Sequence, residues 1–455
     1  MFSPVIFREY DIRGVYEKEF DLDFCKELGK AFTRYLRKEG LKPLVTIGHD
    51  ARLSSPDISK ALIKGINEEG GDVLFLGLVT TPISYFSMFE TEATGGIMVT
   101  GSHNPPDYNG FKISKGKTTI FGEQIQDLKR IVEGPEDNSI DYAVGSTKEI
   151  DIFTPYLDKY TKEFSGLEDI KVVVDCGNGA AGSVIRKLYE GVGLKPIILF
   201  EEPDGNFPNH HPDPTVEKNL KELKKSVLEN NAHIGIGFDG DADRIAIVDE
   251  NANSILGDEL MILVSRYILM ENPGEKIIGD VKCSDRLYED IEKCGGKPIM
   301  WKTGHSLIKN KIKEEKAPFG GELSGHIFFA DKNYGYDDAL YAGLRLVEIL
   351  AKTGKTPSQL LEGLPTVYNT PEIRIDTTEE KKVSIVKILK EKYSSDTEDY
   401  KVNQIDGVRI SYKDGWALAR SSNTQPVLVL RFEATSEESL NRIQNEIESL
   451  VKPLL

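Results

Sequence analysis

Four short segments of the sequence carry side chains that could take part in group transfer. The first, residues 100–104 (TGSHN), follows an apolar run at 97–99 and ends at two prolines. The prolines stop any helix, so the hydroxyl of Ser102 stands at a constrained tip with the imidazole of His103 beside it. This pair suits covalent catalysis in which Ser102 carries the transferred group. A turn whose serine only bonds its own backbone explains the same residues equally well.

The second segment places three carboxylates, Asp239, Asp241 and Asp243, at alternating positions. They repel one another unless a cation lies among them, and an all-oxygen ligand set selects a hard cation such as Mg²⁺ or Ca²⁺. Together with Glu250 they match four ligand positions of an EF-hand loop, but Arg244 stands where that loop needs glycine, and the flanks are strand-like. The pattern therefore predicts Mg²⁺ held by one tight turn. A solvated acidic hairpin is the alternative.

The third segment, residues 320–326 (GGELSGH), alternates glycines with polar side chains. The glycines let a ligand approach the backbone closely, and Glu322, Ser324 and His326 present donors and acceptors that suit vicinal hydroxyls. A loop or bulge in a strand pair would also explain this pattern.

The fourth segment is made of Arg420, Ser421, Ser422, Asn423 and Thr424, between two predicted strands. One guanidinium, several hydroxyls and free backbone N–H groups form an anion cradle that suits a phosphate better than a carboxylate. A capped hairpin is the alternative interpretation.

Alternating strands and helices must position the first three segments. Apolar strands at 44–48, 171–175 and 276–280 each end in a polar turn and lead to a helical stretch, which is typical of βαβ units on a mostly parallel sheet. The pattern recurs after about 100–120 residues and predicts three related α/β units. After residue 365, sequence-adjacent strands with outlying helices predict an α+β unit.

The chain has 455 residues, of which 39% are hydrophobic and 29% charged. At about 100–200 residues per domain, this length predicts three or four domains, each able to bury its own core. The composition excludes a disordered chain, and no apolar run approaches the ~18 residues of a membrane-spanning helix. The amino terminus, charged by Arg8, shows no signal-peptide pattern.

The formal net charge is −17, and the four cysteines form no C-x-x-C pair. The acidic surface repels nucleic acid and anionic lipid, so we expect neither nucleic acid nor a membrane as a partner. An anionic substrate would need a locally basic site. The cysteine usage fits a reducing compartment, and we expect the protein in the cytoplasm.

The four segments, in this order, resemble the motifs of the α-D-phosphohexomutase family, and within it the phosphomannomutase/phosphoglucomutase branch. The resemblance extends from residues 7–14 (FREYDIRG) to 430–434 (LRFEA). It implies an α/β fold of three related mixed-sheet α/β domains plus a C-terminal α+β domain around a central cleft.

The expected domains are 1–150 with the phosphoserine loop, 151–252 with the metal-binding loop, 253–366 with the sugar-recognition loop, and 367–455 with the phosphate-binding loop. The link at 133–138 and the segment near Pro365 are the candidate boundaries in the sequence itself.

The resemblance implies a phosphohexomutase that interconverts hexose 1-phosphate and hexose 6-phosphate, with mannose, glucose or both as the sugar. Ser102 would carry a phosphoryl group, and a hexose 1,6-bisphosphate would be the bound intermediate. The implied cofactors are Mg²⁺ and, as activator, glucose 1,6-bisphosphate or mannose 1,6-bisphosphate. The implied partners are small-molecule phosphosugars; monomer and dimer both stay open.

The resemblance also implies a role for each matching residue. The metal ligands would be Ser102, Asp239, Asp241 and Asp243. The catalytic residues would be Ser102, His103, Arg13, Lys112, Lys282 and His326. The substrate-binding residues would be Tyr10, Arg244, Lys282, Gly304, His305, Glu322, Ser324, His326, Arg420, Ser421, Ser422, Asn423 and Thr424. A lysine that acts as the base would need a lowered pKa, which nearby Arg13 and Arg244 could provide.

Three alternatives remain. A phosphoglucosamine mutase is disfavoured by Leu323, since that branch typically has glutamine there. A phosphatase, in which water takes the phosphoryl group from Ser102, would not need the second phosphate cradle at 420–424. A structural metal-binding protein built on the aspartate turn would not depend on Ser102 at all.

Overall fold

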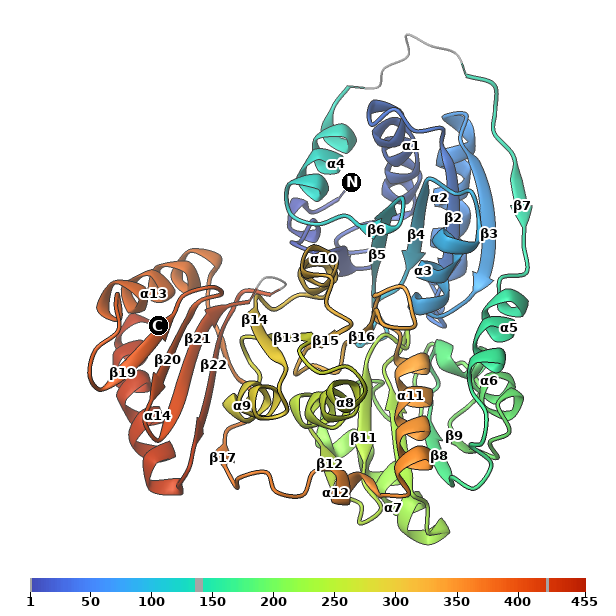
Figure 1. Cartoon of the computed structure of the whole chain (residues 1–455). Coiled ribbons are helices and arrows are strands. Elements are labelled where there is room, and N and C mark those ends of the chain that lie inside the picture. Colours follow the sequence, from blue (N-terminus) through green and yellow to red (C-terminus); the bar gives the residue numbers. More distant parts are fainter. Residues whose placement is uncertain (1, 136–141, 423–424) are drawn as a thin grey trace.

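The computed structural model describes residues 2–135, 142–422 and 425–455, and four sheets follow one another along the chain (Figure 1). The C-terminal sheet and its two helices, coloured red, lie to one side of the other three units. Within these ranges no helix combines the length and the hydropathy that a membrane crossing requires.

The first sheet contains seven strands in the order β1-β5-β4-β2-β3-β7, with β6 paired to β5. Its strands are β1 (Ile12–Val15), β2 (Leu44–His49), β3 (Asp72–Leu78), β4 (Gly95–Val99), β5 (Tyr108–Lys115), β6 (Thr118–Thr119) and β7 (Thr147–Glu149). Its helices are α1 (Leu22–Lys38), α2 (Ser55–Glu68), α3 (Thr81–Glu90) and α4 (Glu123–Glu133). The centre is parallel, whereas β4 and β5 are antiparallel.

Strand β7 decides where the first unit ends. It pairs in parallel with β3, so the sheet continues past the segment 133–138 as far as Glu149. The expected boundary at 133–138 is therefore wrong, because the chain returns to the same sheet after it. Residues 136–138 of that segment lie outside the described residues.

The second and third sheets repeat the same plan. The second has the order β12-β11-β10-β8-β9, and the third β14-β13-β15-β16. Their strands are β8 (Val172–Asp175), β9 (Ile197–Leu199), β10 (Ile234–Phe238), β11 (Ile245–Val248), β12 (Ser254–Ile255), β13 (Lys276–Asp280), β14 (Lys297–Trp301), β15 (Phe319–Gly321) and β16 (Ile327–Phe329). Their helices are α5 (Phe153–Glu163), α6 (Ile185–Gly191), α7 (Lys221–Asn230), α8 (Gly257–Glu271), α9 (Asp285–Lys293), α10 (His305–Glu315), α11 (Ala339–Thr353) and α12 (Pro357–Leu360). Because β12 pairs with β11, the second sheet extends beyond residue 252.

The fourth sheet has the order β17-β22-β21-β20-β19, with β18 paired to β22, and all of its pairs are antiparallel. Its strands are β17 (Tyr368–Asn369), β18 (Ile373–Asp376), β19 (Tyr400–Asn403), β20 (Val408–Tyr412), β21 (Gly415–Ser421) and β22 (Val427–Ala434). Helices α13 (Glu379–Lys392) and α14 (Glu437–Val451) pack on it (Figure 1). This is the α+β unit that the sequence predicts.

Each of the four predicted functional loops lies in an antiparallel hairpin. In the first three sheets the hairpin, β4–β5, β10–β11 or β15–β16, follows the parallel strands, and its loop carries Ser102, the three aspartates or Glu322. The fourth loop joins β21 to β22. The equivalent placement of the loops agrees with three related α/β units.

The hydrophobic cores do not follow one core per unit. One continuous buried cluster covers the second and third sheets and also includes Val79 and Phe86 of the first unit. The first and fourth units keep clusters of their own. The second and third units therefore share one core, in which α8 and α11 contact strands of both sheets, while each of the two units also has a smaller buried cluster of its own.

Buried polar contacts attach the fourth sheet to the third unit. The guanidinium of Arg409 donates to the carbonyl oxygens of Val281 and Cys283, and its Nη2 lies 2.6 Å from the Asp285 carboxylate. The same guanidinium stacks over the Trp416 ring, 3.8 Å from its centroid. The fourth sheet is thus attached to the third unit by Arg409, and also by Arg431, whose buried guanidinium donates to the Lys282 carbonyl.

Candidate active site

The serine loop directs Ser102 at the acidic turn of the second unit. Ser102 is 2% exposed and has a left-handed backbone, with φ at +50°. Its Oγ donates to Oδ2 of Asp239 at 2.8 Å and lies 3.2 Å from Nδ1 of His103. Burial, together with the neighbouring Arg244 and Arg13, holds the pKa of His103 well below its usual range. The serine therefore meets a carboxylate and a neutral imidazole.

The acidic turn is a tight one closed by its own backbone. The N–H groups of Asp243 and Arg244 both donate to Oδ1 of Asp239 at 3.1 Å. All three aspartates are fully buried, and each offers a carboxylate oxygen within 4.8 Å of the others. Burial and the charges of Asp241 and Asp243 raise the pKa of Asp239 well above its usual range.

The carboxylates of this turn are only partly neutralised. Lys112 contacts Oδ2 of Asp241 at 2.6 Å and also Oδ2 of Asp243. In the part of the chain that is described, Oδ1 of Asp241 has no hydrogen-bond partner, and Oδ1 of Asp243 has a contact of 3.3 Å with Nε2 of His326. A buried carboxylate oxygen without a partner fits a hard divalent cation, which the aspartates and the Ser102 Oγ could hold.

The two candidate lysine bases have raised, not lowered, pKa values. Burial opposes their charge, but Asp241 and Asp243 outweigh it and raise the pKa of Lys112. Glu372, whose carboxylate lies 2.8 Å from Nζ, similarly raises the pKa of Lys282. The expected lowering is therefore wrong for both, because carboxylates contact both ammonium groups directly. Lys112 and Lys282 are ammonium cations in this arrangement.

The sugar-recognition loop meets the acidic turn through His326. Nδ1 of His326 bonds Oε2 of Glu322 at 2.7 Å, and Nε2 lies 3.3 Å from Oδ1 of Asp243. Burial opposes protonation, but Asp243 and Glu322 raise the pKa of His326 to about 9. Ser324 Oγ lies 3.3 Å from the same Nδ1, and Arg244 Nε lies 3.3 Å from Nε2. Five of the predicted residues are thus joined in one network.

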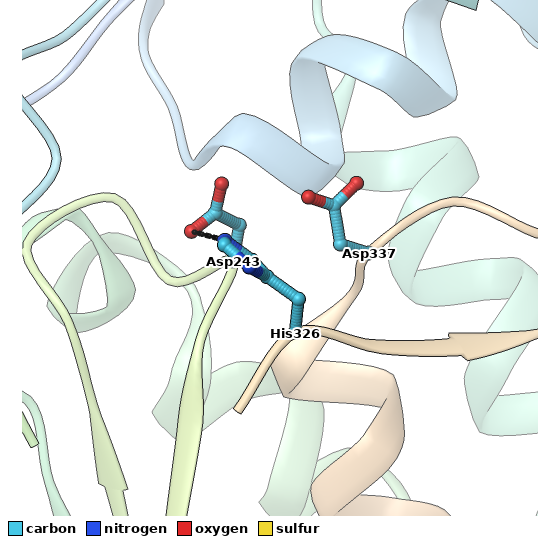
Figure 2. Close-up of side chains that lie close together, drawn as sticks. All are labelled: Asp243, His326 and Asp337. Atoms are coloured by element: carbon cyan, nitrogen blue, oxygen red, sulfur yellow. Dashed lines mark ion pairs between the residues drawn. The ribbon is translucent and has the colours of Figure 1, made fainter. Parts of the chain in front are cut away.

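Asp337 is a site residue that the sequence analysis did not select. It lies just before α11, and its carboxylate, the His326 ring and the Asp243 carboxylate each offer an atom within 4.8 Å of the others (Figure 2). Its Oδ1 accepts a hydrogen bond from Lys309 at 2.9 Å, and its Oδ2 lies 3.6 Å from Nδ1 of His305. Its charge is thus already matched by a buried lysine, so we assign it a supporting role beside the histidines.

The N-terminal segment and the turn before α10 enclose the sugar loop. Tyr10 donates its hydroxyl to the Thr303 carbonyl at 2.7 Å, and the Gly304 N–H donates to Oε1 of Glu322 at 2.5 Å. Gly304 has φ at +139°, and a Cβ there would lie 2.4 Å from the Tyr10 ring. The ring of His305 lies 5.5 Å from that of His326. Only glycine fits between these two units.

The phosphate-binding loop faces the serine loop across a cavity. Arg420 is buried, and its Nε donates to Oδ2 of Asp406 at 3.0 Å; the Ser421 hydroxyl donates to the Lys382 carbonyl at 3.2 Å. Ser422 begins the loop, whereas Asn423 and Thr424 lie outside the described residues. The cavity has a volume of about 280 Å³, and its lining is Arg8, Asp11, Arg13, Glu19, Asn104, Tyr108, Asp376, Gln425, Pro426 and Val427.

Arg13 connects this cavity to the serine loop. Its Nη1 donates to Oδ1 of Asn104 at 2.8 Å, and its Nη2 lies 2.5 Å from the Asp11 carboxylate. The structure therefore brings together all of the described site residues of the first three loops, and places Arg420 in the loop that faces them across the cavity.

Comparison with known proteins identifies the family. Four family models match consecutive segments: the phosphoglucomutase/phosphomannomutase alpha/beta/alpha domains I, II and III over 4–138, 154–253 and 256–368, and the C-terminal domain of the same family over 372–450. A phosphomannomutase/phosphoglucomutase from Pseudomonas aeruginosa is 43% identical over 447 residues, which cover 98% of this chain and 95% of that protein.

Two further relatives carry names from the same family. A phosphoglucomutase from Neisseria gonorrhoeae is 41% identical over 450 residues, with 98% of this chain and 96% of that protein covered. A crystal structure of a phosphoglucomutase/phosphomannomutase family protein from Burkholderia thailandensis superposes with a TM-score of 0.91 at 42% identity, covering 100% of this chain and 98% of that one. The chain belongs to the phosphoglucomutase/phosphomannomutase family.

Proposed function

We propose that the chain is a phosphohexomutase that converts hexose 1-phosphate to hexose 6-phosphate, with both mannose and glucose as substrates. One observation carries the proposal: the Ser102 hydroxyl lies 2.8 Å from Asp239 in a buried acidic turn that His326 joins to Glu322 of the sugar loop. The names of the relatives at 41–43% identity support it.

Mg²⁺ fits the acidic turn. Ser102, Asp239, Asp241 and Asp243 would hold it, because they supply only oxygen ligands and Oδ1 of Asp241 has no hydrogen-bond partner among the residues the structure describes. When bound, the ion would supply Lewis-acid stabilisation of phosphoryl oxygens.

Phosphoryl transfer would proceed from phosphorylated Ser102. The bond between its Oγ and phosphorus breaks while phosphorus bonds the free hydroxyl oxygen of hexose 1-phosphate, which gives a hexose 1,6-bisphosphate. Lys112 and Arg244 are placed to neutralise the negative charge around Ser102. We assign the departing hydroxyl proton to the imidazole of His103, whose pKa is lowered, because the pKa values of both lysines and of His326 are raised.

The second half-reaction requires the sugar to turn end for end. Glu322 and Ser324 would bind the ring hydroxyls at positions 3 and 4, which can exchange places in the two orientations. The phosphate that does not react would be held by Arg420, Ser421 and Ser422, together with Asn423 and Thr424. Contacts at the cleft wall would come from Tyr10, Arg13, Lys282, Gly304 and His305. Ser102 would take back the other phosphoryl group and leave hexose 6-phosphate.

The preference for mannose and glucose over glucosamine rests on the identity of Leu323. Its side chain packs against the core shared by the second and third sheets, and its N–H lies 3.3 Å from the Asp280 carboxylate. Glucose 1,6-bisphosphate or mannose 1,6-bisphosphate would prime Ser102 as activator. The four free thiols are compatible with our proposal that the enzyme works in the cytoplasm.

A turnover panel tests the function. Mannose 1-phosphate, glucose 1-phosphate and glucosamine 1-phosphate are each supplied with Mg²⁺ and a trace of glucose 1,6-bisphosphate, and both the 6-phosphate product and free phosphate are measured. We expect comparable isomerisation of the first two. Conversion of glucosamine 1-phosphate alone would identify a phosphoglucosamine mutase, and free phosphate without isomerisation would identify a phosphatase.

A serine pair provides the matched control. Ser102→Ala removes the acceptor hydroxyl and should abolish turnover, whereas Ser59→Ala removes an equally buried hydroxyl that bonds only the Ser55 carbonyl within α2. Equal turnover of the Ser102→Ala variant and the wild-type enzyme would contradict the covalent mechanism. It would leave a protein that uses the acidic turn only to bind metal.

A further inference from the structure

Arg52 lies beneath the serine loop. It does not line the cavity described above, and it does not contact the three aspartates of the acidic turn. Its side chain is fully buried. Nη2 donates to the carbonyl oxygens of Ser102 and Asn104 at 2.8 and 2.7 Å, and Nη1 donates to those of Pro105 and Tyr108 at 2.5 and 3.0 Å. One guanidinium therefore gathers four carbonyl groups of the loop that carries the phosphoryl acceptor.

Asp50 holds the other side of this guanidinium. Its Oδ2 accepts from Arg52 Nε at 3.1 Å and also from the Thr100 hydroxyl and the Gly101 N–H, at 2.9 and 3.2 Å. A Cβ on Gly101 would lie 2.4 Å from Arg52 Nε, so the glycine before the serine is required by the close approach of the arginine. The Asp50–Arg52 pair thus fixes both ends of the loop.

A segment of the second unit closes over the same arginine. The Phe207 ring lies 5.3 Å from the Arg52 guanidinium, and a Cβ on Gly205 would meet the backbone of Leu53 and Ala51 at 2.6 and 2.7 Å. Phe207 itself has a left-handed φ of +49°. The second unit therefore both supplies the acidic turn and packs against the residue that shapes the serine loop.

We propose that Arg52 is a positioning residue of phosphoryl transfer, which holds the serine loop so that the Ser102 Oγ points at Asp239. This inference rests on the proposed function. Ser102 keeps an unfavourable left-handed backbone, and four carbonyls converging on one side of the loop would repel one another without a shared donor. The planar fork of arginine reaches all four oxygens and Asp50 together, whereas a lysine ammonium is a single point donor.

The test is the kinetics of Arg52→Lys and Arg52→Met, measured with glucose 1-phosphate, Mg²⁺ and saturating glucose 1,6-bisphosphate. We expect kcat to fall at least about 100-fold in Arg52→Met and about 10-fold or more in Arg52→Lys, with KM changed less than about threefold, because a misplaced nucleophile affects only the reacting geometry. The rate at which glucose 1,6-bisphosphate phosphorylates Ser102, followed by intact mass, should fall in parallel.

A second measurement separates positioning from general stability. Arg52→Ala leaves room for a guanidinium ion, and added guanidinium, below concentrations that unfold the protein, should restore part of kcat. The control Arg186→Met loses an exposed arginine on α6 that pairs with Glu201, and it should keep wild-type kcat.

Three results would overturn the inference. They are an Arg52→Met kcat within threefold of wild type, a loss expressed wholly in KM, and a failure of guanidinium to restore any kcat to Arg52→Ala. Because the wild-type enzyme is assayed beside the variants, absence of isomerisation in the wild type would instead contradict the proposed function. In that case hydrogen exchange of the backbone amides of residues 100–104 and 107–108 still decides the role of Arg52: faster exchange in Arg52→Lys supports it, and unchanged exchange refutes it.

Discussion

Replacing Thr81 by valine should weaken metal binding, although Thr81 is not itself a proposed metal ligand. Thr81 begins α3 in the first unit, and its side chain is fully buried against the second unit. Its Oγ1 donates to Oδ2 of Asp241 at 2.6 Å, while its backbone N–H donates to the Asp241 carbonyl at 2.9 Å. Valine has nearly the same shape, so Thr81→Val removes only the hydroxyl bond.

The size of the effect follows from the type of bond that is lost. A hydrogen bond to a charged group contributes about 1.5–3 kcal/mol, and removing a partner that orients a metal ligand typically costs about 10–100-fold in metal affinity. We therefore expect the Mg²⁺ concentration at half-maximal turnover to rise about 10–100-fold in Thr81→Val. At saturating Mg²⁺, kcat should return to within a few-fold of wild type, because Lys112 still contacts Asp241.

The assay is the turnover of glucose 1-phosphate against Mg²⁺ concentration. Thr33→Val is the matched control, since Thr33 is equally buried but donates only to the Gly29 carbonyl within α1. An unchanged Mg²⁺ midpoint in Thr81→Val, or an equal shift in Thr33→Val, would refute the claim that the first unit orients the metal turn.

Three further predictions concern stability and the cleft. Burial raises the pKa of Asp338 from 3.8 to about 7. Its contribution to the free energy of unfolding is therefore fully present below about pH 4 and is lost as the pH rises to about 7. The loss is at most about 1.4 kcal/mol per pH unit. Urea unfolding of Asp338→Asn across this range should lack that slope, and a slope equal to that of the wild type would contradict the assignment. Arg409→Met leaves buried carbonyls and a carboxylate without their donor, so the free energy of unfolding should fall by about 3–5 kcal/mol. The C-terminal unit should then unfold in a separate calorimetric transition at lower temperature. A single, unshifted transition would show that this contact does not hold the unit. Gly304→Ala should raise KM for glucose 1-phosphate at least about 10-fold, because its Cβ would displace Tyr10, whereas Gly354→Ala, with open space around it, should leave KM unchanged.

The sequence by itself determined the chemistry of the loops and most of the elements that carry them. The strands predicted at 44–48, 171–175 and 276–280 are β2, β8 and β13, because short apolar runs ending in polar turns are local signals. The alternating aspartates, the G-E-L-S-G-H loop and the serine tip lie where their spacing indicates, each in a hairpin. Helices α8 and α11, whose residues are nearly all buried, were not predicted, and neither was the amphipathic α1.

Only the tertiary structure decided which groups act on one another. The sequence shows Thr81, Arg52 and Asp337 as ordinary polar residues after strands or before helices, because their partners lie 160, 50 and 28 residues away. It also leaves the pKa of Lys112 open, since that depends on carboxylates brought to it from another unit. Residue types and local spacing are fixed along the chain, whereas burial and charge neighbours arise only when separate units pack together. The active site of this protein is built at those contacts.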